Sequence, residues 1–168
     1  MLMSFLSKVW RILVIEFDFV KVKSSDDKLL KSIHQSEVEA FGEGGEDLWT
    51  LRPMAEQQLI LAAVTLDEVL AHAILWRNWN NTGTAYLHSF VVHRTRQGKG
   101  LGRLFFKRLK DYLLKSKIER LQLTIHESNL AASKIYLSES RLLEKSFIPN
   151  AYGEGEDRWF WTLCIKNL

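Results

Sequence analysis

The segment 90–102 constrains this chain more than any other, because it joins an apolar strand to an amphipathic helix through a glycine-rich turn. Phe90-Val91-Val92 is followed by a basic stretch and then by Gln97-Gly98-Lys99-Gly100-Leu101-Gly102. Glycine lets the backbone approach an anion closely, and the start of a helix aims unpaired N–H groups and a partial positive charge at it. The segment therefore predicts a cradle for a phosphate or pyrophosphate group.

The spacing of this loop excludes two well-known phosphate-binding motifs. A P-loop needs Ser or Thr directly after its Gly-Lys pair, whereas Lys99 is followed by Gly100. A dinucleotide-binding fingerprint needs a further glycine at position 103, which is Arg103. The helix that follows is expected from about Gly98 to Lys115, because apolar residues recur at helical spacing. They are Leu101, Leu104, Phe105, Leu109, Tyr112 and Leu113.

The remaining pattern predicts strands interleaved with helices, in an α+β arrangement around a mixed sheet. Strands are expected at 17–23, 58–64, 69–76, 85–92, 121–125, 147–148 and 159–165. Helices are expected from Ser24–Asp27 to about Gly42, at 48–54, and from Ser128 or Asn129 to Leu137. The first helix would bury Leu29, Leu30, Ile33 and Val38, and regular alternation would put Tyr86, His88 and Phe90 on one face of their strand.

Composition and length indicate one globular domain. The chain has 168 residues, of which 46% are hydrophobic and 26% charged, and this balance excludes a disordered or coiled-coil protein. We expect a single domain at 17–168 preceded by an extension or extra strand at 1–16. Lys8 and Arg11 interrupt the apolar N-terminus, which falls short of the roughly 20 residues of a membrane span. The lone Cys164 allows no internal disulfide and favours a reducing, cytoplasmic location.

Basic residues gather beside the glycine loop. Seven of the 23 Lys and Arg residues, and no acid, lie between Arg94 and Lys110, which leaves 16 basic against 20 acidic residues elsewhere. A local cationic loop on an acidic body favours a small polyanionic ligand over nucleic acid. Acidic residues cluster at 37–47 and 154–157. They are interpreted either as solvated surface or as an acidic entrance to the active site that attracts a cationic amine.

Two motifs in the expected order resemble the Gcn5-related N-acetyltransferase (GNAT) family. Gln97-Gly98-Lys99-Gly100-Leu101-Gly102 is similar to the family's acyl-CoA signature, Gln/Arg-x-x-Gly-x-Gly/Ala. The strand 121–125, followed by Asn129 to Tyr136, is similar to its strand and Asn-x-x-Ala-x-x-x-Tyr block. The resemblance extends from about Phe17 to the C-terminus. It implies a mostly antiparallel sheet of six to seven strands with about four helices. It also implies acetyl-CoA as co-substrate with no metal, and N-acetyl transfer by direct attack of a primary amine in a ternary complex.

The resemblance also implies which residues contact acetyl-CoA. Backbone N–H groups from Gln97 to Gly102 would hold the pyrophosphate, with charge added by Lys99 and Arg103. The strand end Phe90-Val91-Val92 would offer main-chain hydrogen bonds to the pantetheine arm, where two strands are expected to separate. Asn129 would bind the pantetheine or the pyrophosphate.

Tyr136 matches the family's general acid, which protonates the leaving CoA thiolate. A phenol of pKa about 10 donating to a thiolate whose conjugate pKa is about 8.5 faces a small uphill step. Without the resemblance, Tyr136 would be interpreted as a core aromatic residue of its helix, beside Ala132 and Ile135.

The general base is expected to be His88, because neither central strand carries an acid and imidazole titrates near neutral pH. The alternative is a half-buried histidine satisfied by a backbone carbonyl. His126 and Glu127, just beyond strand 121–125, are the reserve candidates.

The acceptor is less constrained than the acyl donor. The turn from Asn150 to Asp157 resembles the Tyr-x-x-Gly-Glu-Asp turn of members that acetylate protein N-termini, including the ribosomal-protein subgroup, and there Tyr152 would lie by the acceptor's backbone. Thr124 stands where that subgroup usually has a glutamate. The acceptor is therefore a peptide N-terminus or a small-molecule amine. Trp76 and Trp79 are interpreted as hairpin packing or as a homodimer contact.

Two other functions are weighed against an enzyme. A catalytically silent acyl-CoA-binding sensor would keep the cradle and lose the base, which the absent strand carboxylate favours and Tyr136 opposes. A nucleic-acid-binding module is disfavoured, because the basic patch is one loop and helix. The expected partner is an amine acceptor, with no nucleic acid or membrane partner.

Overall fold

The computed structural model describes residues 16–66 and 68–166, so the N-terminal segment 1–15 lies outside the described residues. The elements in chain order are β1 (Asp18–Lys21), α1 (Asp27–Phe41), η1 (Gly42–Gly44), α2 (Leu48–Gln57), β2 (Leu59–Thr65), β3 (Glu68–Arg77), β4 (Thr84–Val92), η2 (Arg94–Arg96), α3 (Leu101–Lys115), β5 (Arg120–Ile125), α4 (Leu130–Glu139), β6 (Arg141–Ile148) and β7 (Arg158–Cys164). The expected α+β fold is confirmed.

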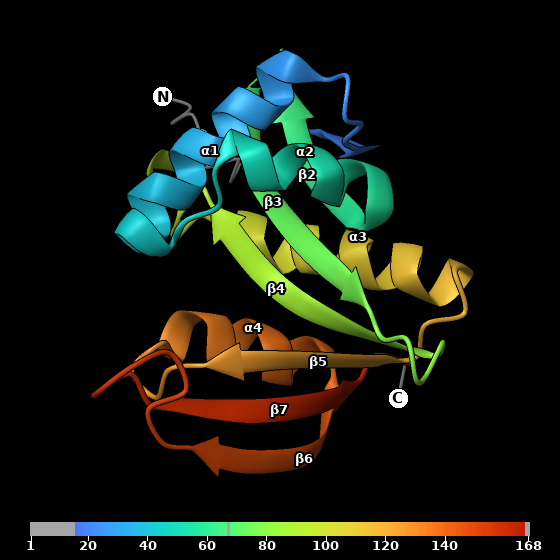
Figure 1. The fold of residues 1–168 in the computed structure, drawn as a ribbon. Helices are drawn as coiled ribbons and strands as arrows, with labels where there is room; N and C mark the ends of the chain where they lie inside the picture. Colours follow the sequence, from blue (N-terminus) through green and yellow to red (C-terminus); the bar gives the residue numbers. More distant parts are fainter. Residues whose placement is uncertain (1–15, 67, 167–168) are drawn as a thin grey trace, which may run out of the picture.

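The seven strands form one sheet in the order β1-β2-β3-β4-β5-β7-β6. Only β4 and β5 are parallel, since α3 connects them as a crossover, and all other neighbours are antiparallel. Figure 1 shows the sheet opening between β4 and β5.

Two apolar clusters hold the helices on the two faces of the sheet. One cluster packs α1 and α2 against β2 and β3 through Leu30, Ile33, Leu51, Ile60 and Ile74. The larger cluster packs α3 and α4 against β3, β4, β5 and β7, and contains Phe105, Phe106, Leu109, Tyr136 and Trp161. The two ends of the opened sheet are therefore each braced by helices, which keeps the gap between β4 and β5 in place.

Helix starts follow the local sequence. Asp47 caps α2 by accepting from the Thr50 N–H at 2.8 Å, and Asn129 caps α4 by accepting from the Ala132 N–H at 3.1 Å. Gly100 precedes α3 with φ +83°, a left-handed conformation that suits glycine.

The expected buried stripes are wrong at particular positions. In α1 Val38 was expected to be buried but is exposed, and its neighbour Glu37 is buried instead. In α3 Leu104 lies at the surface and Phe106 is fully buried. Strand β6 is longer than the expected 147–148, because an edge strand that faces solvent shows no regular alternation of apolar residues.

The burial of Phe106 in place of Leu104 on α3 can be tested by substitution. Phe106→Ala is expected to lower the free energy of unfolding by about 3–5 kcal/mol, since it empties a fully buried ring site. Leu104→Ala, the matched control on the same helix, should cost less than about 1 kcal/mol. Urea denaturation of both variants measures the difference, and equal losses would contradict the packing.

Candidate active site

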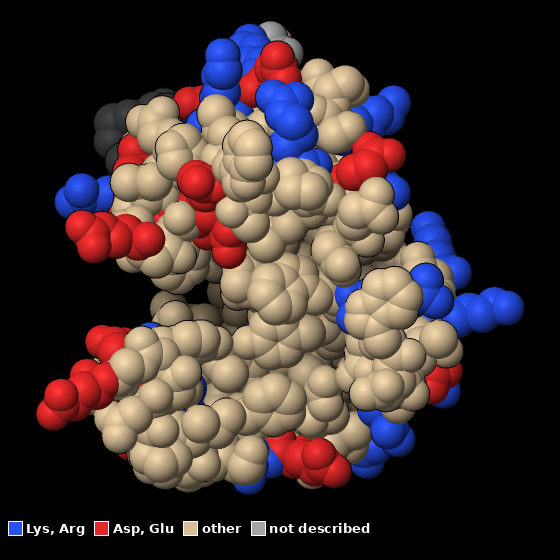
Figure 2. Space-filling view, viewed as in Figure 1, with Lys and Arg blue, Asp and Glu red and all other residues tan. Residues whose placement is uncertain are grey.

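The parallel strands β4 and β5 separate part-way along their length. They pair from Thr84 opposite Arg120 to Leu87 opposite Leu123, and no pairing continues beyond that point among the described residues. A cavity of about 520 Å³ lies at this separation. It is lined by Ser36, Glu39, Ala40 and Phe41 of α1, by Phe90–Arg94, and by Gln97 and Asn129. In Figure 2 a hollow lies between the upper and lower parts of the molecule.

The glycine loop presents a row of unpaired N–H groups. None of the backbone N–H groups from Gly98 to Arg103 finds an acceptor within residues 16–66 and 68–166. Gly98 and Gly100 have φ of +71° and +83°, and a Cβ at either position would meet open space. An anion fits this arrangement, because the free N–H groups and the N-terminus of α3 converge on one exposed loop.

Gly102 has a different role in the same motif. A Cβ there would come within 3.0 Å of Ile135 Cδ1 and 3.2 Å of Val92 Cγ2. The missing side chain lets α3 approach both α4 and the end of β4. Leu101 beside it is buried, so only its backbone is available to a ligand.

The polar side chains predicted to contact the cofactor make internal contacts. Gln97 Nε2 donates to the Val92 carbonyl at 3.0 Å, and Lys99 Nζ donates to the Thr95 carbonyl at 2.8 Å. Arg103 Nε lies 2.5 Å from Glu139 Oε1 on α4. The cations beside the loop therefore brace it, while the N–H groups stay free.

Tyr136 of α4 is buried in the core against β4 and α3. Its side chain is 6% exposed and packs edge-on against Phe90, at 6.0 Å between ring centroids, and against Phe106 at 5.2 Å. Burial raises the pKa of its phenol. The Tyr136 hydroxyl is thus a proton donor at neutral pH, held between β4 and α3.

A β-bulge in β4 reverses the expected alternation. Ile74 pairs with Ser89 and Leu75 with Leu87, so His88 is the extra residue. Tyr86 and His88 lie on the face toward α1 and α2, whereas Phe90 packs on α3 on the opposite face. The prediction of one shared face is therefore wrong, because a bulge shifts the side-chain period by one.

His88 is paired with a carboxylate and an aromatic ring. Its Nε2 lies 2.6 Å from Glu46 Oε1, and Trp76 stacks on the imidazole at 4.2 Å between centroids. The side chains of His88 and Glu46 are 25% and 16% exposed. Trp76 therefore packs on His88 with one part of its ring system in solvent, and Trp79 is the more exposed of the two tryptophans at the hairpin.

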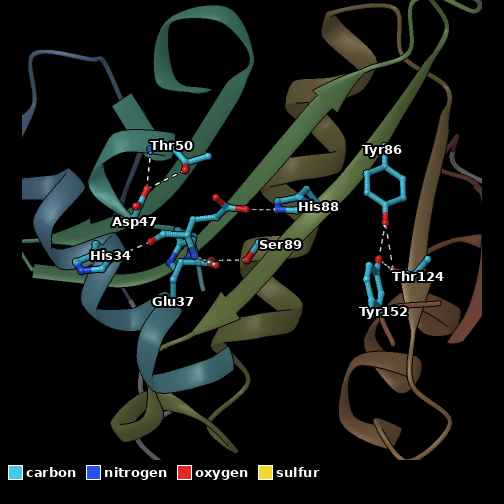
Figure 3. A network of polar contacts seen from close by, with 11 residues as sticks. His34, Glu37, Asp47, Thr50, Tyr86, His88, Ser89, Thr124 and Tyr152 are labelled. Atoms are coloured by element: carbon cyan, nitrogen blue, oxygen red, sulfur yellow. Dashed lines mark hydrogen bonds and ion pairs between the residues drawn. The ribbon is translucent and has the colours of Figure 1, made fainter. Parts of the chain in front are cut away.

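A buried carboxylate lies behind this pair. Glu37 of α1 is 1% exposed, and its Oε1 lies 2.6 Å from His72 Nε2 and accepts from the Ser89 hydroxyl. Burial alone would raise the pKa of Glu37, but the interactions with His72, Ser89 and the Glu46 N–H outweigh it, and the pKa lies below its usual value. Glu37 is thus held ionised inside the protein (Figure 3).

Three hydroxyl groups meet on the other side of His88. Thr124 Oγ1 of β5 lies 2.7 Å from the Tyr152 hydroxyl and 3.1 Å from the Tyr86 hydroxyl, and the two phenols are 3.3 Å apart. Burial raises the pKa of Tyr86 to about 12. The contacts hold the 150–157 loop against both central strands beside the gap (Figure 3).

Most acids of the two predicted clusters have internal roles. Glu37 and Glu46 pair with histidines, Asp47 caps a helix, Glu156 pairs with Arg158, and Asp157 accepts from the Asn150 N–H. Figure 2 shows acidic side chains on both sides of the hollow, over the end of α1 and over the 150–157 loop. The reserve residue His126 contacts Ser128, and Glu127 is exposed.

The comparisons with known proteins agree with this geometry. The model of the Acetyltransferase (GNAT) family matches residues 27–138, which is more than half of the chain. The chain belongs to this family. The resemblance seen in the sequence is thereby confirmed. No curated protein matches the chain by sequence.

Solved structures with the same fold cover nearly the whole GNAT chain. The ribosomal-protein-S18-alanine N-acetyltransferase from Escherichia coli is 23% identical with a TM-score of 0.72, over 91% of this chain and 96% of that one. The yncA protein from Salmonella typhimurium, solved with its cofactor acetyl-CoA, is 18% identical with a TM-score of 0.70, over 91% and 96%. The aminoglycoside 6'-N-acetyltransferase from Enterococcus faecium is 13% identical with a TM-score of 0.71, over 90% and 98%.

None of the helices within residues 16–66 and 68–166 combines the length and the apolar composition that a membrane span requires. Within the same residues no group of three His, Cys, Asp or Glu side chains converges on a point where a metal ion would be held.

Sequence reasoning missed Glu37, Glu46 and Trp76 as parts of the site. One signal for Glu37 was present, since it follows Ile33 by four residues and Leu30 by seven, on the buried stripe of α1. A charged residue at such a position is rarely buried without a partner. Glu46 carried no such signal, because it lies in a loop.

The lowered pKa of Glu37 predicts an acid-dependent loss of stability. Glu37→Gln is expected to lower the free energy of unfolding by about 1.5–3 kcal/mol at neutral pH, the range for hydrogen bonds to a charged group. Because the folded pKa lies below 4.5, this stabilisation is present above pH 4.5 and is lost as the pH falls below it. Urea unfolding between pH 5 and 3 measures the difference, with Glu43→Gln as the control for loss of one charge. A difference that grows toward pH 3 would contradict an ionised Glu37.

Proposed function

We propose that this GNAT protein is an acetyl-CoA-dependent N-acetyltransferase that transfers the acetyl group directly to a primary amine. The observation that carries the proposal is the cavity where β4 and β5 separate. Gln97 of its lining begins the glycine loop, and Phe90 of its lining packs on Tyr136 and belongs to β4, the strand that also carries His88.

The residues present fit acetyl-CoA. The N–H groups from Gly98 to Arg103 would hold the pyrophosphate, and the unpaired end of β4, Phe90 to Val92, would hold the pantetheine arm. Asn129 lines the same cavity from the start of α4. Bound acetyl-CoA supplies a thioester carbonyl for attack and a thiolate leaving group. Residues 90–102 thereby fix where that carbonyl lies relative to the two catalytic side chains.

Tyr136 serves as the general acid. Burial keeps its phenol protonated at neutral pH, and the packing of Phe90 and Phe106 holds the ring in place. The hydroxyl has no hydrogen-bond partner within the described residues, so its proton is free to be donated to the leaving thiolate.

His88 serves as the general base. A carboxylate only accepts hydrogen bonds, so the short contact with Glu46 places a proton on Nε2 and leaves Nδ1 as the basic nitrogen. Trp76 fixes the plane of the ring by stacking. Glu46 also stabilises the imidazolium formed when His88 takes the proton of the amine, as in other carboxylate-imidazole pairs.

The acceptor is proposed to be a primary amine, with peptide N-termini as the first class to test. Tyr152 lies against Thr124 beside the base, where the turn resembling the N-terminal acetyltransferases would meet an acceptor backbone. The Escherichia coli structure with the same fold is a ribosomal-protein acetyltransferase, and this supports a peptide acceptor. Small-molecule amines are the second class of acceptor to test. The proposed setting is the reducing cytoplasm, as the lone Cys164 favours.

The silent-sensor alternative loses its main argument. It rested on the absence of a carboxylate on the central strands, and Glu46 reaches His88 from the loop before α2. This contact supports His88 as the base, and the enzyme is the function we put forward.

Ligand binding and turnover test the proposal together. Acetyl-CoA and CoA at about 100 times their dissociation constants should each add roughly 2.7 kcal/mol of stability, visible as a raised melting temperature, whereas ATP should add none. Thiol release against a panel of peptides and amines then identifies the acceptor. No shift with either CoA species would contradict the cradle, and a shift without thiol release would contradict the enzyme.

Replacing Tyr136 by Phe separates chemistry from binding. The kcat is expected to fall about 100-fold or more, with little change in the acetyl-CoA dissociation constant or in the melting temperature, because only an unbonded hydroxyl is removed. Tyr112→Phe, on α3 outside the cavity, is the matched control. Steady-state thiol release measures kcat, and unchanged turnover would rule out Tyr136 as the acid.

A further inference from the structure

The buried carboxylate of Glu37 contacts the backbone of Glu46 and the side chain of Ser89, which is the neighbour of His88 in the sequence. Its Oε1 accepts from the hydroxyl of Ser89, the residue next to His88 in the β4 bulge. Its Oε2 accepts from the backbone N–H of Glu46 at 3.4 Å. One side chain therefore connects the strand that carries the imidazole to the loop that carries its carboxylate.

The loop that carries Glu46 is shaped against the same helix. His34 Nδ1, one turn before Glu37, contacts the Glu46 carbonyl at 2.9 Å. A Cβ on Gly45 would lie 2.6 Å from the backbone of Glu37, so only glycine allows the loop to approach α1 this closely. Asp47 then begins α2 directly after Glu46. The face of α1 with His34 and Glu37 thus acts as the template for this loop (Figure 3).

The interior position of Glu37 is not explained by packing. It is anchored to His72 of β3, which is itself fully buried with an unpartnered Nδ1 among the described residues. Burying a charged pair is costly, and such pairs are weak contributors to stability compared with apolar residues of the same size. Their best-attested benefit is that they fix one arrangement of the groups around them.

We propose that Glu37 is a positioning residue that holds His88 and Glu46 in register for proton transfer. The proposal deepens the function above and rests on it, because it assigns Glu37 no contact with substrate. Its chemistry explains why a carboxylate is needed. Two oxygens accept from His72, Ser89 and the Glu46 N–H together, whereas an amide would turn its NH₂ group toward one of these donors.

The effect of Glu37 on the His88–Glu46 contact is tested first by NMR, which requires no catalytic turnover. In the full chain carrying ¹⁵N-labelled histidine rings, the Nε2–H of His88 bonded to Glu46 should give a slowly exchanging N–H signal, assigned by its loss in His88→Gln. We expect Glu37→Gln to abolish the signal, as Glu46→Ala does, and Glu43→Gln, exposed on η1, to keep it. Retention of the signal in Glu37→Gln would overturn the proposal.

Kinetics supply the second readout. Glu37→Gln is expected to lower kcat by about 10- to 100-fold, a part of the contribution of a general base, with the KM for acetyl-CoA changed less than about twofold. The double variant Glu37→Gln/Glu46→Ala should be no slower than Glu46→Ala alone, because both changes break the same pair. Effects that multiply would overturn the proposal.

The two readouts separate this inference from the proposed function. If Glu37→Gln abolishes the N–H signal while His88→Gln and Glu46→Ala leave kcat unchanged, the positioning stands and the role of His88 as base fails. If Glu37→Gln does not fold, Ser89→Ala removes one bond of the carboxylate and should weaken the signal and kcat together. An undiminished signal in Ser89→Ala would then count against the proposal.

Discussion

The end of hydrogen bonding between β4 and β5 after Leu87 and Leu123 is the constraint on which the rest of this structure depends. A parallel pair that continued would fill the space now open to a ligand. Because α3 and α4 pack on one face and α1 and α2 on the other, the two strands are held apart without losing the core. The end of β4, from Phe90 to Val92, and Gln97 of the glycine loop line the cavity at this separation.

The bulge at His88 adds the second condition for chemistry. It puts His88 and Ser89 on the side of α1, while Phe90 turns to α3 and packs on Tyr136. His88 and Tyr136, the proposed base and acid, thereby lie on opposite faces of β4. In the proposed reaction an amine would reach the acyl group from the α1 side, with Tyr136 on the other side. A regular strand would place His88 and Phe90 on one face.

Much of the fold was accessible to sequence reasoning. The order of elements, the glycine loop and the cap at Asn129 all follow from local patterns, because such features depend on residues within a few positions of each other. The expected stripe failed at Val38, where the packing of α1 buries Glu37 instead, and at Leu104, where the packing of α3 buries Phe106 instead. The bulge in β4 also escaped, since it is defined only by pairing with β3.

The candidate site also has features that the sequence predicted and features that only the structure revealed. Periodicity, glycine spacing and motif resemblance identified the family from the sequence alone, and they predicted a cradle at Gln97–Gly102 and Tyr136 and His88 as candidate catalytic residues. The tertiary structure alone decided that Glu46 reaches His88, that Glu37 is buried behind both, and that Lys99 and Arg103 turn to internal partners. The physical reason is distance along the chain. Main-chain geometry within a turn is set by neighbouring residues, whereas a contact between residues 42 positions apart exists only once the intervening sheet and helices have packed.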